Sequence, residues 1–359
     1  MFGILDKYIG KTMYKMIMTT LFLLVSLSSM IKFFDQLRQT GKGEYTALSA
    51  FVYTLLTIPK DIEIFLPMAT LLGVLIGLGS LVRHREIVVM QASGFTRIKI
   101  TRSVIKTAIP LMLLSLAGGE FIAPQGEAIA RTYRANKLTN HNIVTTKSEL
   151  WAKDNNDFIF IEHICNNKTL LGVSIYSLGY NHKLQNICYA SSAIYNINKK
   201  AWNLKKVSQS NLSDPNQIKN IQILNKEWKT SLTPDKLDFI TLDPATLSIS
   251  GLYRYISYLE QSGQITNLYQ LNMWGKISQP LAVAAMMIMA LSFIFGPLKN
   301  MSTTKQIVIG GGLGSAFYLI NQIFRPLSLI YHIPPIPTVV LPSAIFFSIS
   351  IILLEKWKQ

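Results

Sequence analysis

Acidic side chains and cysteines are scarce in this sequence of 359 residues. It has 19 aspartates and glutamates against 35 lysines and arginines, and only two cysteines. Charged residues make up 15% of the chain, whereas hydrophobic residues make up 49% and are gathered into long runs. So few charges cannot solvate so much apolar surface in water, and we therefore expect a membrane protein.

The net charge of +16 does not by itself indicate a nucleic-acid partner. Lysines and arginines are scattered around the apolar segments and nowhere form a dense basic patch with interleaved aromatic residues. Such a patch is the usual footprint of nucleic-acid binding. We therefore expect no nucleic acid among the partners of this chain.

Motifs for catalysis and metal binding are missing as well. Cys165 and Cys188 do not form a Cys-x-x-Cys pair; they could form a disulfide on the oxidising side of a membrane, but two free thiols are the simpler expectation. Neither His-Glu-x-x-His nor Gly-x-Ser-x-Gly occurs. Gly10-Lys11-Thr12 resembles the end of a phosphate-binding loop, but Leu5 stands where its first glycine is required. We expect no metal site, no catalytic residue and no nucleotide hydrolysis in this chain.

Six apolar segments are long enough to cross a membrane as helices. An even number places both termini on one side, and the lysines and arginines at the N-terminus, between Leu81 and Arg102 and from Lys299 to Lys305 mark that side as the cytoplasm. The second span should be separated from a preceding helical part at Pro59-Lys60-Asp61-Ile62-Glu63, and the third should end at Ala123-Pro124. The segments are Met16–Phe34, Ile64–Ser80, Ser103–Ile122, Asn272–Phe295, Ile307–Phe324 and Thr338–Leu354.

Two of these spans carry glycines four residues apart. The pairs are Gly73 with Gly77 and Gly310 with Gly314. This spacing places two small residues on one helix face, where a neighbouring helix can approach closely. We expect such a contact for the first pair.

The stretch between the third and fourth spans is polar and alternates as β-strands do. The alternation is clear in Asp157–Glu162, Leu171–Leu178, Leu184–Tyr195 and Trp202–Ser208. Strands at this spacing without intervening helices predict an all-β sandwich or jellyroll. We therefore divide the chain into helical residues 1–124, a β-domain outside the cytoplasmic membrane at 125–247, and residues 248–359, which begin with a connecting helix.

The basic loop from Leu81 to Arg102 joins the second and third spans. Its core, Glu86-Ile-Val-Val-Met-Gln-Ala-Ser-Gly94, predicts a short helix that ends at a glycine. On the cytoplasmic side, such a helix would offer a contact surface to a soluble partner.

Several basic residues do not follow the charge bias of the loops, because they fall near the outer ends of the spans. One such residue usually extends its charge to the membrane surface, but several at a similar depth favour a site for an anionic lipid head group. Pairing with Asp35, Asp61 or Glu63 is the main alternative. The residues are Lys32, Lys60, Arg131, Arg134 and Arg325.

Short motifs throughout the chain resemble the LptF/LptG family, whose members are permease subunits of the lipopolysaccharide export ABC transporter of Gram-negative bacteria. The resemblance runs nearly from end to end. The motifs are Leu5–Thr12, Pro59–Asp61, Val88–Thr96, Ala123–Glu127, Trp228–Thr230, Tyr269–Trp274 and Ala290–Leu298.

The resemblance implies an inner-membrane protein with six spans and a periplasmic β-jellyroll between spans three and four. It implies pairing with LptF, a cytoplasmic LptB dimer that hydrolyses ATP, and passage of lipopolysaccharide to LptC and the periplasmic LptA bridge. The loop helix, at about residues 83–96, would couple to LptB through Glu86, with Arg85, Met90 and Gly94 beside it.

The same resemblance implies that four of the outer basic residues line the cavity that takes lipopolysaccharide from the outer leaflet. These are Lys32, Lys60, Arg131 and Arg134, and Arg325 joins them by position alone. Two alternatives remain at this stage. One is a membrane-bound enzyme that modifies envelope lipid, and the other is an ABC permease for another envelope cargo such as lipoprotein.

Overall fold

A computed structural model describes residues 3–356, with gaps at 139–147, 155–156, 167, 180–182, 197–198, 200, 213–218, 231, 235–243, 262, 297–301 and 332. The predicted basic loop Lys299–Lys305 therefore lies partly outside the described residues, because residues 299–301 fall in one of these gaps. The chain divides into two compact units. The first is helical and comprises residues 1–134, 248–250 and 267–359, and the second contains the β-strands.

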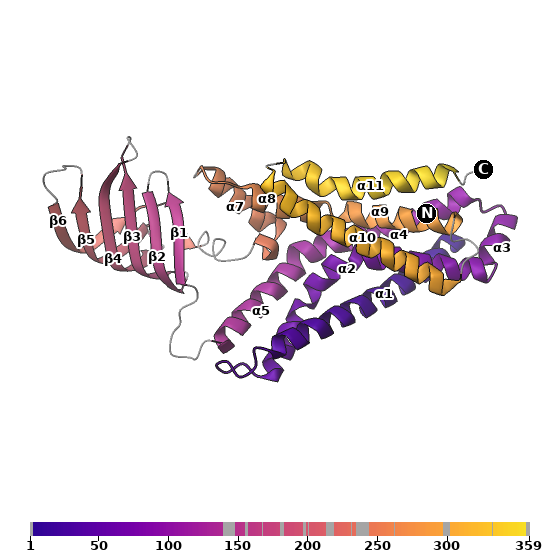
Figure 1. Ribbon diagram of the computed structural model, residues 1–359, viewed down its shortest axis with the longest axis horizontal. Helices are drawn as coiled ribbons and strands as arrows, with labels where there is room; N and C mark the ends of the chain where they lie inside the picture. The colour runs from indigo at the N-terminus through magenta and orange to yellow at the C-terminus, as the bar shows by residue number, and fades with distance from the viewer. Residues whose placement is uncertain are drawn as a thin grey trace. The chain divides into compact units, whose positions relative to one another are not determined.

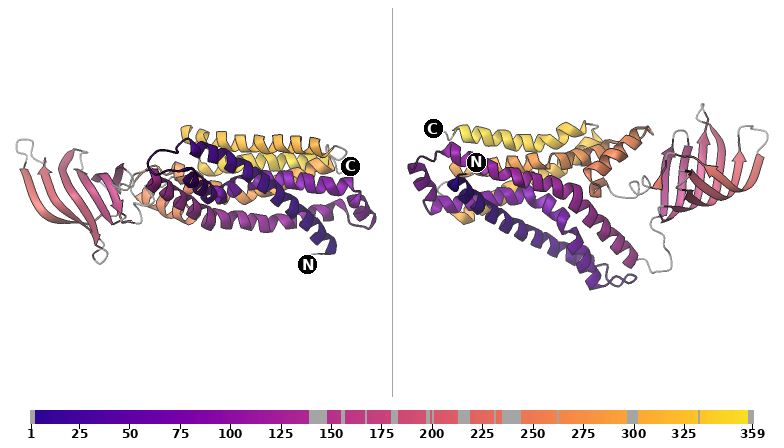
Figure 2. Two further views of the ribbon diagram at one scale, coloured as in Figure 1. Left: turned by 90° about the horizontal axis from the view of Figure 1, so that it is seen from below. Right: turned by 180° about the vertical axis from the view of Figure 1, so that it is seen from behind.

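The first unit is a bundle of long helices (Figures 1 and 2). Helix α2 packs against α1, α9 and α10, and α9 also packs against α4 and α11. The apolar side chains between them form one core, which includes Ile17, Leu75 and Met286. The elements are α1 (Ile4–Leu37), α2 (Ala47–Arg83), α3 (Glu86–Ala92), α4 (Arg97–Ala117), η1 (Gly118–Ile122), α5 (Ala123–Leu138), α8 (Asn267–Ile277), α9 (Gln279–Phe295), α10 (Thr303–Ile330) and α11 (Pro335–Lys356).

Among the described residues, five helices are long and apolar enough to cross a membrane. The number rises to six if α8 and α9, which meet at an angle of 47°, together form one bent span. The predicted class of helical membrane protein is confirmed at this level.

Helix α2 corrects the predicted division at Pro59–Glu63, because it is continuous from Ala47 to Arg83 with Pro59 and Pro67 inside it. Proline has no N–H, so each one leaves the carbonyl four residues earlier without its helical donor. For Pro67 that carbonyl belongs to Glu63, and Gln279 Nε2 of α9 donates to it at 2.6 Å. A distant side chain thus replaces the missing backbone donor.

The third span is also longer than predicted, since the helix does not end at Ala123-Pro124. A π-helical turn, η1, joins α4 directly to α5, and Ala123 N–H donates to the carbonyl of Gly118, five residues back. At the same spacing Pro124 would need an N–H for the carbonyl of Gly119, and Lys276 Nζ donates there instead at 3.1 Å. The predicted stop was therefore wrong, because a side chain from another helix replaces the donor that Pro124 lacks, as Gln279 does for Pro67.

The glycine pairs are positions of close helix contact, as predicted for the first. A Cβ built on Gly73 would lie 2.5 Å from the Cα of Ile17 on α1. A Cβ built on Gly310 would lie 2.5 Å from Leu75 Cδ1 on α2. Only residues without a Cβ allow α1 and α10 to approach α2 so closely.

The second unit contains one six-stranded antiparallel sheet, in which each strand pairs with its neighbours in the chain. All four predicted strand segments lie in this sheet, which confirms the antiparallel β class. The described strands form a single sheet and not the two packed sheets of a sandwich. The strands are β1 (Ser148–Asp154), β2 (Asp157–Asn166), β3 (Thr169–Leu178), β4 (Leu184–Asn196), β5 (Ala201–Asn211) and β6 (Lys219–Trp228), followed by η2 (Pro244–Thr246) and α7 (Ile249–Gln261).

One face of the sheet is apolar and buried. It includes Ile159, Val173 and Ala190, and the indole N–H of the fully buried Trp202 donates to the carbonyl of Leu232 at 2.7 Å. Cys165 and Cys188 are both free.

Candidate functional site

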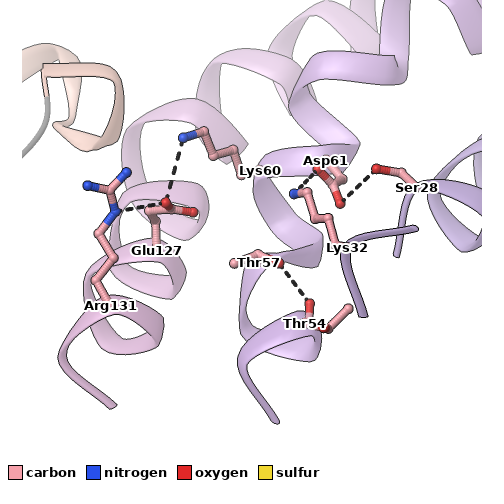
Figure 3. A network of polar contacts seen from close by, with 8 residues as sticks. All are labelled: Ser28, Lys32, Thr54, Thr57, Lys60, Asp61, Glu127 and Arg131. Carbon is pink, nitrogen blue, oxygen red and sulfur yellow. Dashed lines mark hydrogen bonds and ion pairs between the residues drawn. The ribbon is translucent and has the colours of Figure 1, made fainter. Parts of the chain in front are cut away.

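Three of the five predicted basic residues meet where α1, α2 and α5 lie close together (Figure 3). Lys32 extends from α1, Lys60 from α2 and Arg131 from α5. Figure 3 shows that each points toward a carboxylate, Lys32 toward Asp61 and the other two toward Glu127. These three cations therefore form an organised polar group. Together with Arg134, we call them the outer cation group.

Asp61 is the partner of Lys32. Lys32 Nζ lies 2.5 Å from Asp61 Oδ1, and the hydroxyl of Ser28 donates to Oδ2 at 3.3 Å. The Asp61 side chain is only 2% exposed, whereas that of Lys32 is 36% exposed. The alternative that Asp61 pairs with one of the cations is confirmed for this residue.

Glu127 holds two cations through one oxygen. Arg131 Nε donates to Glu127 Oε1 at 2.9 Å, and Lys60 Nζ lies 3.8 Å from the same atom. Glu127 is one helical turn before Arg131, so the pair has the favourable i, i+4 spacing. Sequence reasoning missed Glu127 because the helix was expected to stop at Pro124. A helix continued past that proline would have revealed the spacing.

Arg134 completes the outer cation group on the next turn of α5. Its Nη2 donates to the side-chain oxygen of Gln39 at 2.8 Å, and its guanidinium carbon lies 5.5 Å from the centre of the Tyr53 ring. Both contacts leave its positive charge intact. Within the described part of the chain, Arg134 forms no ion pair.

Arg325 extends from α10 toward α8. Its Nη2 would be 3.2 Å from a Cβ at Gly275 on α8, next to Lys276. Lys276 Nζ lies 3.8 Å from Glu63 Oε2, and both of these side chains are largely buried. Glu63 therefore pairs with Lys276, which was not predicted, and it also interacts electrostatically with the predicted Arg325. Asp35 forms no ion pair with any described residue.

The outer cation group carries an excess of positive charge. Its four cations outnumber the two carboxylates of Asp61 and Glu127, and the three cations paired with these acids remain partly exposed. Lysine and arginine side chains recognise phosphate through charge-assisted hydrogen bonds. Among the described residues, no group of three or more possible metal ligands occurs.

The predicted short helix is present as α3, and Gly94 follows it with a φ of +84°. Arg85 precedes α3 with a φ of +57°, and the carboxylate of Glu86 accepts a hydrogen bond from Tyr8 OH at 2.8 Å. Met90 is buried in the helical core. The exposed apolar side chains of α3 are instead Val88 and Val89.

A bundle of helices long and apolar enough to cross a membrane defines a helical membrane protein. A family model described as lipopolysaccharide export system permease LptF/LptG matches residues 7–356, and the chain belongs to this family. It is 54% identical over 355 residues to the lipopolysaccharide export system permease protein LptG of Escherichia coli K12, with 99% of each chain covered. It is 43% identical over 346 residues to LptG of Haemophilus influenzae, with 96% of each covered. The resemblance seen in the motifs is thereby confirmed.

Proposed function

We propose that this chain is the non-catalytic permease subunit of an ATP-driven transporter that extracts lipopolysaccharide from the outer leaflet of the inner membrane. One observation carries the proposal: Lys32, Lys60 and Arg131 gather where α1, α2 and α5 lie close together, with Arg134 on the next turn of α5. They belong to a chain that matches LptG permeases over almost its full length. The phosphate groups of lipopolysaccharide suit such cations. Arg325, which lies beside Lys276 and Glu63, does not contact the head group in this proposal.

The topology that fits this function has six spans, with α8 and α9 counted as one. Both termini are cytoplasmic, and the sheet is the described part of a periplasmic jellyroll between spans three and four. The basic residues of the N-terminus and of the Leu81–Arg102 loop support this orientation, because lysine and arginine favour the cytoplasmic side.

We further propose that α3 is the contact for an LptB dimer, which would hydrolyse the ATP. The exposed Val88 and Val89 and the carboxylate of Glu86 offer apolar contact and charge on one short helix. The phosphate-binding loop that an ATPase needs is incomplete here, since Leu5 replaces its first glycine. LptF would be the second permease, and LptC and the LptA bridge would receive the lipid.

A photoreactive residue placed at Lys60 or Arg134 in the assembled complex tests the cargo. We expect a lipopolysaccharide adduct at both positions and none at Ile352, an exposed residue of α11. An active complex without an adduct at either position would contradict the site. Depletion of the chain should cause lipopolysaccharide to accumulate in the inner membrane, whereas accumulation of lipoprotein would support a different cargo.

A further inference from the structure

We propose that Asp61 and Glu127 are competing carboxylates, which hold the cations when no lipid is bound and which the phosphate of a lipid head group displaces. The inference rests on the proposed function and adds a way for the lipid to leave. Both acids are buried, at 2% and 6% exposure, between cations that are exposed by 36%, 23% and 38%.

The contact between Lys32 and Asp61 allows exchange because only one partner is fixed. Asp61 is buried, and its second oxygen accepts a hydrogen bond from Ser28. Lys32 has a long flexible side chain that is partly exposed, so its ammonium can turn to another anion while the carboxylate stays in place. A phosphate oxygen at the exposed side would replace Asp61 Oδ1 as the acceptor.

Glu127 allows exchange for a different reason. One oxygen serves both Lys60 and Arg131, and the distance of 3.8 Å to Lys60 is too long for a hydrogen bond. Lys60 is therefore attracted to Glu127 without a hydrogen bond to it, and a phosphate with several acceptor oxygens offers it a closer partner. Arg131 can then share its donors between phosphate and Glu127.

Arg134 gives the exchange its direction. Its charge is not cancelled by a carboxylate within the described residues, and its contacts with Gln39 and Tyr53 are neutral. This charge attracts the phosphate first. The carboxylates reduce the net positive charge that the bound phosphate meets, and they take the cations back when the lipid leaves. Without them the lipid would be held more tightly and released more slowly.

The test uses the assembled transporter in nanodiscs, loaded with lipopolysaccharide and kept without ATP. The half-life of the bound lipid should lengthen roughly three- to ten-fold in Asp61→Asn and in Glu127→Gln, which keep the side-chain shape but remove the charge. Asp35→Asn is the matched control. It removes one negative charge from α1, but Asp35 forms no ion pair with a described residue, so the half-life should be unchanged. Dephosphorylated lipopolysaccharide should show no lengthening in any variant.

An unchanged or shorter half-life in both variants, with Lys60→Ala shortening it, would overturn the exchange and leave the proposed function standing. Loss of lipid retention by the unaltered complex would overturn both. Millimolar inorganic phosphate should not displace the lipid from Glu127→Gln, and displacement would instead assign the site to free phosphate. If Asp61→Asn fails to assemble, the Glu127→Gln result decides the question.

Discussion

The side-chain amide of Gln279 donates to the backbone carbonyl of Glu63, 216 residues earlier, across 2.6 Å. That carbonyl lacks its helical donor because Pro67 stands four residues beyond it. The contact joins the start of α9 to the middle of α2. The contribution of this hydrogen bond to stability can be measured separately from the packing of Gln279, because replacing Pro67 restores the backbone donor.

Replacement of Gln279 by Leu should therefore destabilise the protein by about 1–3 kcal/mol, the cost of an unpaired buried polar group. Pro67→Ala restores an N–H inside α2, so Gln279→Leu should cost much less in that background. Thermal unfolding of the four proteins in detergent gives the coupling energy through a double-mutant cycle. Equal losses in both backgrounds would show that Gln279 acts through packing alone.

Gly73→Ala should destabilise the helical unit, because the added Cβ would lie 2.5 Å from the Cα of Ile17 and α1 would have to move. Overpacking of this kind costs about 1–3 kcal/mol. Gly312→Ala on α10 is the matched control, since a Cβ there meets no atom within 4 Å. Thermal unfolding should separate the two variants, and similar stability would contradict the close contact.

Gly94→Ala should loosen the end of α3. The φ of +84° is unfavourable for a residue with a Cβ, by about 1 kcal/mol, although no neighbouring atom would obstruct the methyl group. We expect faster hydrogen exchange in the amides of α3 and weaker copurification with LptB. Gly94→Asn should lose less, because asparagine tolerates this conformation better than alanine. Exchange rates that match the unaltered protein in both variants would contradict the role of this glycine.

The two cysteines should differ in reactivity and in pH dependence. Burial raises the pKa of the Cys188 thiol, and the nearby ammonium of Lys226 offsets only part of this effect. A maleimide should therefore label Cys165 first at neutral pH, as mass spectrometry of the peptides would show.

The raised pKa also sets the sign of the stability change. The neutral Cys188 thiol is favoured in the folded sheet, so its contribution is complete below the pKa of an unfolded cysteine, about 8.5, and is lost as the pH rises through the folded value. The sheet should therefore lose stability as the pH rises above about 8.5 toward the pKa of folded Cys188. Cys188→Ala should remove this loss. Labelling of Cys188 before Cys165 would contradict the burial on which both expectations rest.

Local sequence signals predicted the features that local interactions decide. The helix α3 with Gly94 after it, the four alternating segments of the sheet and the contact of Gly73 all follow from spacing within a few residues. The family match supplied the remaining expectations for cargo and partners. Neither the local signals nor the family match depends on which side chains from distant parts of the chain contact one another.

The features that sequence reasoning missed depend on such distant contacts. Helix interruptions were expected at Pro59–Glu63 and at Pro124. The side-chain donors that compensate for Pro67 and Pro124 are Gln279 and Lys276, which lie on other helices far along the chain. Glu127 was overlooked for the same reason, since its helix was expected to have ended. A side-chain donor from another helix can allow a helix to continue through a proline. A short stretch of sequence around that proline does not reveal the donor.

The π-helical turn from Gly118 to Ile122 has a further consequence for the length of this segment. Each residue of a helix advances the chain by about 100° around the axis. If the same residues formed an ordinary helical turn, Glu127 and Arg131 would be rotated away from Lys60 by about that angle. The register of α5, and so the composition of the outer cation group, depends on this wider turn.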